Sequence, residues 1–259
     1  WHIECSTMSG KYLGDAFDIH GGGMDLKFPH HENEKAQSQA GGRAFAKYWM
    51  HNGWLTMAGE KMSKSLGNTA TVTEVVKRFP ARAVRLYLLA PHYRSAVELS
   101  DDALTEATAQ LARLDSFLAR AGEVLGEVAP GEVPAEFAAA MDDDLGTPAA
   151  VAVLFQLVRA GNQALDGPDL AQAEAALAGV RAILSIFGLD PEDEAWRTAG
   201  EQDRQLKPVL DGLVAALLAQ RQQARARKDF NAADAIRDEL ARLGLKIEDT
   251  PTGARWSLG

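Results

Sequence analysis

The sequence predicts an α/β half-domain, then an all-α helical bundle, and then a small α+β module at the carboxyl end. Two observations lead to this fold class. Strand and helix patterns alternate near the amino end, and long amphipathic helical patterns take over from Asp101. A chain of 259 residues exceeds one ordinary compact core, so we expect several domains. The predicted domains are 1–57, 58–100, 101–190 and 202–259.

Charge and composition narrow the class of protein. The net charge is −9, but residues 101–200 hold 5 Lys or Arg against 18 Asp or Glu. Residues 1–100 hold 12 against 9 and residues 201–259 hold 10 against 9, so both ends can present basic surface. One cysteine excludes an internal disulfide framework, and no apolar run approaches the ~20 residues of a membrane span. We therefore expect a cytoplasmic protein without a membrane partner. Because the chain begins at Trp1, we also expect it to be part of a longer protein.

The amino-terminal region alternates strand and helix patterns. Trp1–Cys5 alternates apolar and polar residues, while Phe17–Ile19 and Tyr48–Met57 carry aromatic and apolar residues, so all three are predicted strands. His30–Gly41 is the predicted helix, with Pro29 at its start. Strand–helix–strand alternation predicts parallel pairing, with ligands bound beyond the carboxyl ends of the strands.

Two groups of residues near those strand ends could bind ligands. The triple glycine Gly21–Gly23 predicts a sharp turn at which a ligand can approach the backbone N–H groups. His30 and Glu34 are spaced i and i+4 on one helix face, and with Cys5 they would form a zinc-type donor set. A lone cysteine is also often a buried apolar residue, and histidines at a helix start often only cap it. Spacing alone leaves both interpretations open.

The run Gly59–Asn68 is a basic, hydroxyl-rich loop bounded by glycines. The ammonium groups of Lys61 and Lys64, with the neighbouring serine hydroxyls, suit a phosphate ligand. A solvated surface turn would have a similar composition, so the phosphate interpretation needs further support.

Helical patterns fill the middle of the chain. Two short helices are expected first, one capped by Thr73 and one at Ala81–Ala90 with Val84, Tyr87 and Leu88 facing inward. Three longer helices follow, each marked by a stripe of apolar residues. The stripes are Leu104, Ala107, Leu111, Leu114 and Leu118 in the first, Val151, Leu154, Phe155 and Val158 in the second, and Leu170, Ala173, Leu177, Val180, Leu184 and Phe187 in the third. Glu127–Ala135 is a predicted linker, and Thr147-Pro148 is a predicted helix start. We expect the stripes to form the core of a bundle with an acidic exterior.

The carboxyl end has its own pattern. The predicted elements are a linker at Gly188–Glu201, helices at Leu206–Lys228 and Asn231–Leu243, and a hairpin of Leu245–Asp249 with Ala254–Ser257. The basic end of the first helix, with Phe230 and Trp256 nearby, could bind RNA through phosphate contacts and base stacking. An ordinary solvated face would show the same residues.

Three motifs occur in a fixed order: Trp1–Ser6, Phe17–Glu34, and the KMSKSLGN run Lys61–Asn68. Their order and spacing closely resemble the cysteinyl-tRNA synthetase family, which is a class I aminoacyl-tRNA synthetase. Arg227–Thr252 resembles that family's anticodon-binding module, so the resemblance covers essentially the whole chain. It implies that residues 1–57 form the second half of a Rossmann-like catalytic domain, with the first half and its HIGH motif upstream of Trp1.

This resemblance implies a cysteine–tRNA ligase that uses ATP with Mg to form cysteinyl-adenylate and then charges tRNA(Cys). It implies zinc held by Cys5, His30 and Glu34, with a cysteine upstream of Trp1 as the fourth ligand. Because zinc binds a thiolate and favours its deprotonation, bond type would separate cysteine from serine without an editing domain. The chain alone is expected to be inactive without its upstream half, and the protein is expected to be a monomer.

The other site residues are likewise implied by the resemblance. Lys64, assisted by Lys61, would bind the ATP phosphates and stabilise the charge on the leaving pyrophosphate. Gly21, Gly22, Gly23 and His20 would meet the nucleotide, and Trp1 with His20 would line the cysteine pocket. The positions that match anticodon recognition are Arg225, Phe230, Asp234 and Asp249.

Two other interpretations stay open. A related ligase joins cysteine to an amino sugar in mycothiol biosynthesis, and it shares the zinc site and the adenylate step but uses no tRNA. The KMSKSLGN form and the 202–259 module favour the tRNA enzyme. A non-catalytic RNA-binding fragment would account for the HIGH motif and the fourth zinc ligand lying outside the chain.

Overall fold

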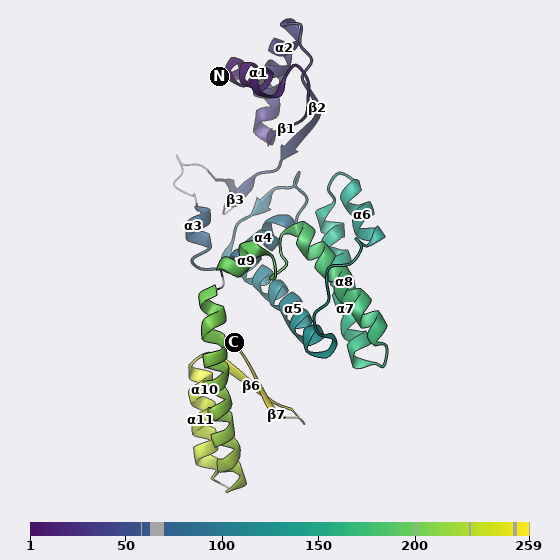
Figure 1. Ribbon diagram of the computed structural model, residues 1–259. Helices are drawn as coiled ribbons and strands as arrows, with labels where there is room; N and C mark the ends of the chain where they lie inside the picture. Colours follow the sequence, from purple (N-terminus) through teal and green to yellow (C-terminus); the bar gives the residue numbers. More distant parts are fainter. Residues whose placement is uncertain (58, 63–69, 200, 228, 251–252, 259) are drawn as a thin grey trace. The chain divides into compact units, whose positions relative to one another are not determined.

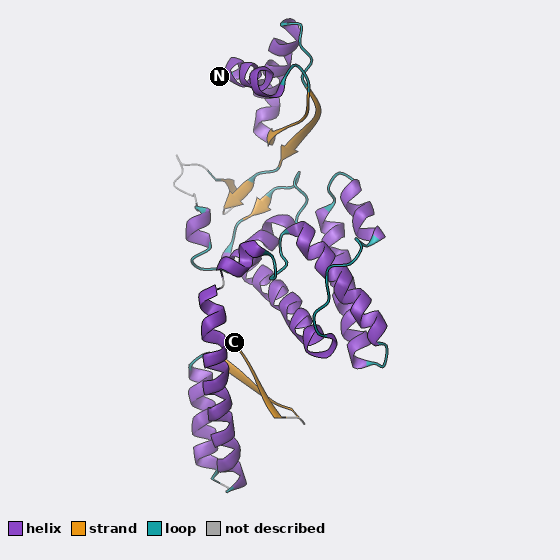
Figure 2. Cartoon of the chain, viewed as in Figure 1, coloured by secondary structure: helices purple, strands orange, loops and turns teal. Residues whose placement is uncertain are grey.

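The computed structural model describes residues 1–57, 59–62, 70–199, 201–227, 229–250 and 253–258. The chain divides into two compact units, Trp1–Asp190 and Pro191–Gly259 (Figure 1). The first unit contains the strand–helix–strand region and a group of packed helices, and the second contains helices and one hairpin (Figure 2). The division of the chain into four domains stays a prediction.

The amino-terminal region has the predicted α/β character. Its elements are α1 (His2–Leu13), β1 (Phe17–Gly23), the 3-10 turn η1 (Met24–Leu26), the π-helical turn η2 (Lys27–His31), α2 (Glu32–Ala40) and β2 (Ala46–Asn52). Strands β1 and β2 pair in parallel, from Phe17 opposite Ala46 to Gly23 opposite Asn52. The predicted parallel strand–helix–strand unit is therefore confirmed.

Two predictions about this region are wrong. Trp1–Cys5 does not form a strand, because α1 begins at His2. An alternating pattern over five residues is too short to distinguish the period of a strand from that of a helix. Within α1 the Ser9 hydroxyl donates a 2.7 Å hydrogen bond to the carbonyl oxygen of Cys5, as helical spacing allows. The glycines Gly21–Gly23 do not turn, because β1 runs through all three and they pair with β2.

The predicted strand Tyr48–Met57 is divided in two. Strand β2 ends before Gly53, whose N–H donates a 2.7 Å hydrogen bond to the Tyr93 carbonyl oxygen. A Cβ at Gly53 would lie 2.1 Å from the Ser95 carbonyl oxygen, so only glycine fits this close approach. The chain then enters a second sheet, in which β3 (Leu55–Met57) pairs antiparallel with β4 (Glu60–Lys61) and parallel with β5 (Val97–Glu98).

Two short helices, α3 (Val72–Val75) and α4 (Ala81–Leu89), lie between these strands in the sequence. Thr71, and not Thr73, caps α3, because its hydroxyl accepts from the Glu74 N–H while the Glu74 carboxylate accepts from Thr71. In α4, Val84 is buried as predicted, but Leu88 is 49% exposed. The buried face of α4 passes through positions 83, 84, 86 and 87, which leaves Leu88 outside it.

The rest of the first unit is the predicted helical bundle. Its helices are α5 (Asp101–Leu125), α6 (Ala135–Asp142), α7 (Thr147–Asp166) and α8 (Leu170–Phe187). The centre of its core consists of Leu114, Phe117, Leu154, Val180, Ile183 and Leu184, each at most 1% exposed. The residues of the predicted stripes are buried or partly buried except Leu170, which is 45% exposed in the first turn of α8. Leu104 and Ala107 do not join the bundle core, because they pack with Val84 and Tyr87 of α4 in a separate cluster. Among the described helices α8 is long and apolar enough to cross a membrane, but half of that span is buried in the core.

The second unit contains the predicted helix pair and hairpin. Its elements are α9 (Glu194–Ala199), α10 (Glu201–Ala226), α11 (Phe230–Arg242), β6 (Leu245–Thr250) and β7 (Gly253–Leu258). The hairpin is antiparallel as expected, but the predicted linker Gly188–Glu201 contains α9, and α10 begins before Leu206. Val214, Leu240 and Leu245 form the core, and Trp256 packs against them. Trp256 therefore contributes to packing within this unit.

Candidate metal centre

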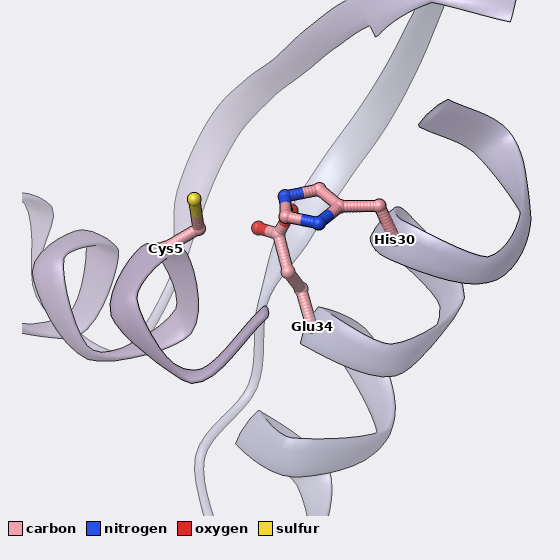
Figure 3. A group of neighbouring side chains, drawn as sticks. All are labelled: Cys5, His30 and Glu34. Atoms are coloured by element: carbon pink, nitrogen blue, oxygen red, sulfur yellow. The ribbon is translucent and has the colours of Figure 1, made fainter. Parts of the chain in front are cut away.

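Three side chains from separate segments converge in the α/β region (Figure 3). Cys5 comes from α1, His30 from η2 and Glu34 from the first turn of α2. The Cys5 sulfur, a His30 ring nitrogen and a Glu34 carboxylate oxygen all lie within 4.8 Å of one another. His30 is 4% exposed and Glu34 is 1% exposed, whereas Cys5 is half-buried. The structure thus brings together the three residues that the sequence suggested as one donor set.

The surroundings of Glu34 are unusual for a buried carboxylate. Its Oε1 lies 2.8 Å from His30 Nε2, and its Oε2 lies 3.0 Å from His20 Nε2. Neither contact has hydrogen-bond geometry, so within the described residues both oxygens of Glu34 and His20 Nε2 are buried without a hydrogen-bond partner. A buried carboxylate in that state costs stability, and a cation among these donors would offset the cost.

A second group overlaps the first at Glu34. His20, His31 and Glu34 also lie with one donor atom each within 4.8 Å of one another. His31 Nδ1 lies 2.9 Å from His51 Nε2, as in a hydrogen bond between two imidazoles. Burial, and then the neighbouring imidazole of His20, lowers the pKa of His31 to about 4, so the ring is neutral near pH 7. Neutral imidazoles are the form that binds metal ions and relays hydrogen bonds.

His2 and Trp1 orient the His30 ring. His2 Nδ1 lies 2.8 Å from His30 Nδ1, which leaves Nε2 of His30 directed at Glu34. The Trp1 ring centroid lies 4.0 Å from that of His30, although Trp1 is 68% exposed overall. A hydrogen bond at the second nitrogen is the usual way in which a ligating histidine is held in place.

The sequence reasoning missed three of these imidazoles. His2 follows Trp1, His31 follows His30, and His51 lies in the aromatic strand β2. Their positions in the sequence carried some signal, because His2 is adjacent to Trp1 and His31 is adjacent to His30. His51 lies on the strand paired with the one that carries His20. Only the parallel register, with Gly22 opposite His51, shows that His51 reaches the same cluster.

The electrostatics of Cys5 suit a site that is completed by a cation. Burial, followed by the negative charges of Glu34 and Glu4, raises the pKa of the Cys5 thiol above its usual value. A bound dication would reverse this effect, because it stabilises the thiolate directly. Tetrahedral zinc holds S, N and O donors roughly 3.5 Å apart, so the observed grouping needs only a small rotation of side chains. The donor set fits zinc.

Gly22 is required by the packing of this cluster. A Cβ at Gly22 would lie 2.9 Å from His31 Cε1 and 2.9 Å from Leu26 Cδ1, whereas a Cβ at Gly21 would make ordinary contacts. A larger residue at Gly22 would therefore displace the His31 ring. The suggested contact of Gly21–Gly23 and His20 with a nucleotide stays a prediction.

The lysines of the KMSKS run lie at the edge of what the structure describes. Lys61 ends β4, and Lys64 lies outside the described residues. In the second unit, Arg225 is exposed in the last turn of α10 and Phe230 is 61% exposed at the start of α11. Asp234 makes a 3.3 Å ion pair with Arg237 one turn away on α11. The fourth anticodon candidate, Asp249, lies on β6. The roles of all four in RNA binding stay predictions.

Three family models match successive parts of the chain. Residues 1–109 match the family of "tRNA synthetases class I (C) catalytic domain", residues 136–190 match the "DALR domain", and residues 207–256 match the "Cysteinyl-tRNA ligase anticodon binding domain". The fold is therefore that of a class I synthetase catalytic domain followed by helical domains.

Curated relatives lead from the class to the family. The chain is 59% identical to the cysteine–tRNA ligase of Cutibacterium acnes, 57% identical to that of Streptomyces griseus and 55% identical to that of a Nocardioides species. Each match covers 100% of this chain but 54%, 56% and 55% of the relative, so the chain spans about half the length of these ligases. The chain belongs to the cysteine–tRNA ligase family.

One solved structure is similar at a lower level. It is the ternary complex of Agrobacterium radiobacter K84 LeuRS with tRNA and LeuAMS, at 21% identity and a TM-score of 0.48. The match covers 67% of this chain and 26% of that one. A similarity of this extent carries no conclusion about function.

Proposed function

We propose that the chain is the part of a cytoplasmic cysteine–tRNA ligase that holds the zinc site, the KMSKS run and the anticodon-binding module. The ligase activates cysteine with ATP and transfers it to tRNA(Cys). The observation that supports this most directly is the convergence of Cys5, His30 and Glu34, where both buried oxygens of Glu34 lack a hydrogen-bond partner among the described residues. This donor set also gives a chemical reason why the enzyme would select cysteine as its amino-acid substrate.

The chemistry of the amino-acid site follows from the donor set. Zinc, when bound there, supplies a Lewis acid that prefers a thiolate to a hydroxyl group. His30 and Glu34 project from consecutive turns of one helical segment, so their separation is set by backbone geometry. Trp1 and His2 hold the His30 ring, and Trp1 with His20 would line the pocket of the substrate cysteine.

The activation step needs positioning more than proton transfer. The carboxylate of cysteine is itself the nucleophile toward the α-phosphate of ATP, so no side chain has to remove a proton. Lys64 and Lys61 would bind the phosphates and stabilise the charge on the departing pyrophosphate, with Mg bound to ATP. Gly21–Gly23 and His20 would lie against the nucleotide.

The second unit supports tRNA as the acceptor. Residues 207–256 match an anticodon-binding family, which a ligase acting on an amino sugar would not need. Arg225 and Phe230 are both exposed there, so a cation and an aromatic ring are accessible to RNA. Asp234 and Asp249 stay candidates for the same role, because they match positions that the family uses in reading the anticodon.

The test combines metal content with the partial reaction. Zinc would be measured in the purified chain, in Cys5→Ala and in the control Ser9→Ala, which changes a residue on the same helix. Cysteine-dependent ATP–pyrophosphate exchange would be measured for the chain alone and mixed with the other half of the Cutibacterium acnes ligase as a separate polypeptide. We expect zinc in the chain and in Ser9→Ala but not in Cys5→Ala, and exchange only in the mixture.

Two results would contradict the proposal. A chain that binds no zinc under any condition would remove the role of the three donors. A mixture that holds zinc but exchanges no pyrophosphate would remove the catalytic role. In a mixture that does exchange pyrophosphate, assays of tRNA(Cys) charging and of cysteine coupling to an amino sugar would separate the tRNA ligase from the amino-sugar ligase.

A further inference from the structure

The three-stranded sheet β4–β3–β5 determines where the chain enters the KMSKS run. In the hairpin of β3 and β4, Thr56 lies opposite Lys61 and Met57 lies opposite Glu60. The pairing continues to Met62, whose N–H donates a 3.3 Å hydrogen bond to the carbonyl oxygen of Leu55. The first two residues of the run, Lys61 and Met62, are therefore held by β3, and β3 itself is held by β5.

Glu98 on β5 binds the turn of this hairpin. Its two carboxylate oxygens accept hydrogen bonds from the Gly59 N–H at 3.2 and 3.3 Å, and one of them also accepts from the Thr56 hydroxyl. Gly59 has φ of +77°, a conformation that favours glycine, and a Cβ there would meet nothing within 4 Å. A charged acceptor thus binds the backbone N–H of the glycine that forms the turn.

Glu98 is in turn fixed from the other side. The Tyr87 hydroxyl donates a 2.6 Å hydrogen bond to the Glu98 carbonyl oxygen, and Tyr87 is only 8% exposed. Tyr87 packs with Val84, Leu104 and Ala107 in a cluster between α4 and α5. The Leu99 N–H also donates a 2.8 Å hydrogen bond to the Thr56 carbonyl oxygen. The carboxylate that holds the turn therefore projects from a backbone anchored to buried helices.

We propose that Glu98 is a positioning residue for cysteine activation, because it binds the Gly59 amide in the turn that precedes the run Lys61–Asn68. This inference rests on the proposed function of that run in binding ATP. Glu98 is solvent-exposed, so its hydrogen bonds contribute little to the free energy of unfolding. The expected signature of Glu98 is a slower activation step at unchanged stability.

The first measurement concerns the turn itself and uses the chain alone. Hydrogen exchange of the Gly59 amide would be followed by NMR in the wild type, Glu98→Ala, Glu98→Gln and Glu106→Ala. Glu106 is an exposed carboxylate on α5 that serves as the control for charge loss. We expect Gly59 exchange about tenfold faster in Glu98→Ala, less so in Glu98→Gln, which keeps one acceptor oxygen, and unchanged in Glu106→Ala. Equal exchange rates in all four proteins would overturn the inference.

The second measurement concerns the reaction, in the mixture with the other half of the Cutibacterium acnes ligase. We expect kcat/KM for ATP in pyrophosphate exchange to fall about tenfold in Glu98→Ala, a change that corresponds to roughly 1.4 kcal/mol. Zinc content, KM for cysteine and the melting temperature should stay at the wild-type values. Wild-type activity in Glu98→Ala, with faster Gly59 exchange, would contradict the positioning role. An inactive wild-type mixture would instead contradict the proposed function, and the Gly59 amide would still report whether Glu98 holds the turn.

Discussion

The helical bundle and the metal corner, formed by α1, β1, η2 and α2, bury very different side chains to a similar depth. In the bundle, Phe117, Leu154 and Ile183 are at most 1% exposed. In the metal corner, the buried side chains are polar: Ser6, His30, His31, Glu34 and Ser38 are each at most 4% exposed. Burial of apolar surface stabilises a fold without any ligand, whereas burial of a charge without partners destabilises it.

The two regions also differ in how far their buried side chains satisfy one another. The bundle core is complete in itself, because its apolar side chains contact one another. In the metal corner, the oxygens of Glu34 and the ring nitrogen of His20 are buried within the described structure without hydrogen-bond partners. The donor atoms of this region lie close together, and under the proposed function a bound zinc ion would add to its stability.

The largest effect is expected in the bundle. Phe117→Ala removes a 1% exposed ring from the centre of the core and should cost about 3–5 kcal/mol of unfolding free energy. Leu170→Ala is the control, because Leu170 is 45% exposed on α8 and should cost less than about 1 kcal/mol. Urea denaturation followed by circular dichroism measures both. A similar cost for the two variants would mean that Phe117 is not central to the core.

In the bundle, loss of a buried side chain should lower the unfolding free energy. In the zinc-free metal corner, loss of the buried charge should not. Zinc at about 100 times its dissociation constant should raise the unfolding free energy of the wild-type chain by about 2.7 kcal/mol. Glu34→Gln should lose this gain, but without zinc it should be no less stable than the wild type, because it removes a buried charge whose oxygens accept no hydrogen bond within the described structure.

Glu32→Gln, an exposed change on the same helix, is the control for that comparison and should keep the gain from zinc. Thermal unfolding with zinc and with a chelator measures all three proteins. A zinc-free Glu34→Gln variant much less stable than the wild type would show that the carboxylate has partners of its own.

A smaller effect separates two adjacent glycines in β1. Gly22→Ala places a methyl group 2.9 Å from the His31 ring and should cost about 1–3 kcal/mol, while zinc affinity falls as the ring moves. Gly21→Ala makes only ordinary contacts, the nearest at 3.5 Å, and should be close to neutral. Zinc titration and thermal unfolding of the two variants provide the measurement. Equal tolerance at both positions would refute the packing role of Gly22.

The smallest effect is a pH dependence at the edge of the bundle. The Arg94 guanidinium and then the Tyr93 hydroxyl bind the carboxylate of Asp144 and lower its pKa. A lowered folded-state pKa means that this stabilisation is present above the unfolded pKa, near 4, and is lost as the pH falls through the folded value. Asp144→Asn should therefore lower the melting temperature by a few degrees at most near pH 7, and by less near pH 3.

Asp143→Asn is the matched control for this prediction, since it is the adjacent carboxylate in the same turn. Differential scanning calorimetry from pH 3 to pH 7 gives the comparison. If the difference in melting temperature between Asp144→Asn and the wild type grows as the pH falls, the folded-state pKa of Asp144 is not lowered.

Local spacing was enough to predict the helical bundle and part of the site. Stripes such as Leu104, Ala107 and Leu111 repeat at the helical period, so burial on one face follows without knowledge of the partner helix. The pairing of His30 with Glu34 follows in the same way from i and i+4 spacing. The ordered motifs also indicated the family, because a run such as KMSKSLGN is specific in context.

What only the tertiary structure decided is the set of contacts between distant segments. Cys5 lies close to His30 because it projects from α1, a helix in a segment where the short alternating pattern predicted a strand. The parallel register of β1 and β2 brings His51 to His31, and this packing explains Gly22 as a close contact instead of a turn. The physical reason is that backbone periodicity is local, whereas a metal centre is built from side chains that only the fold brings within a few ångströms.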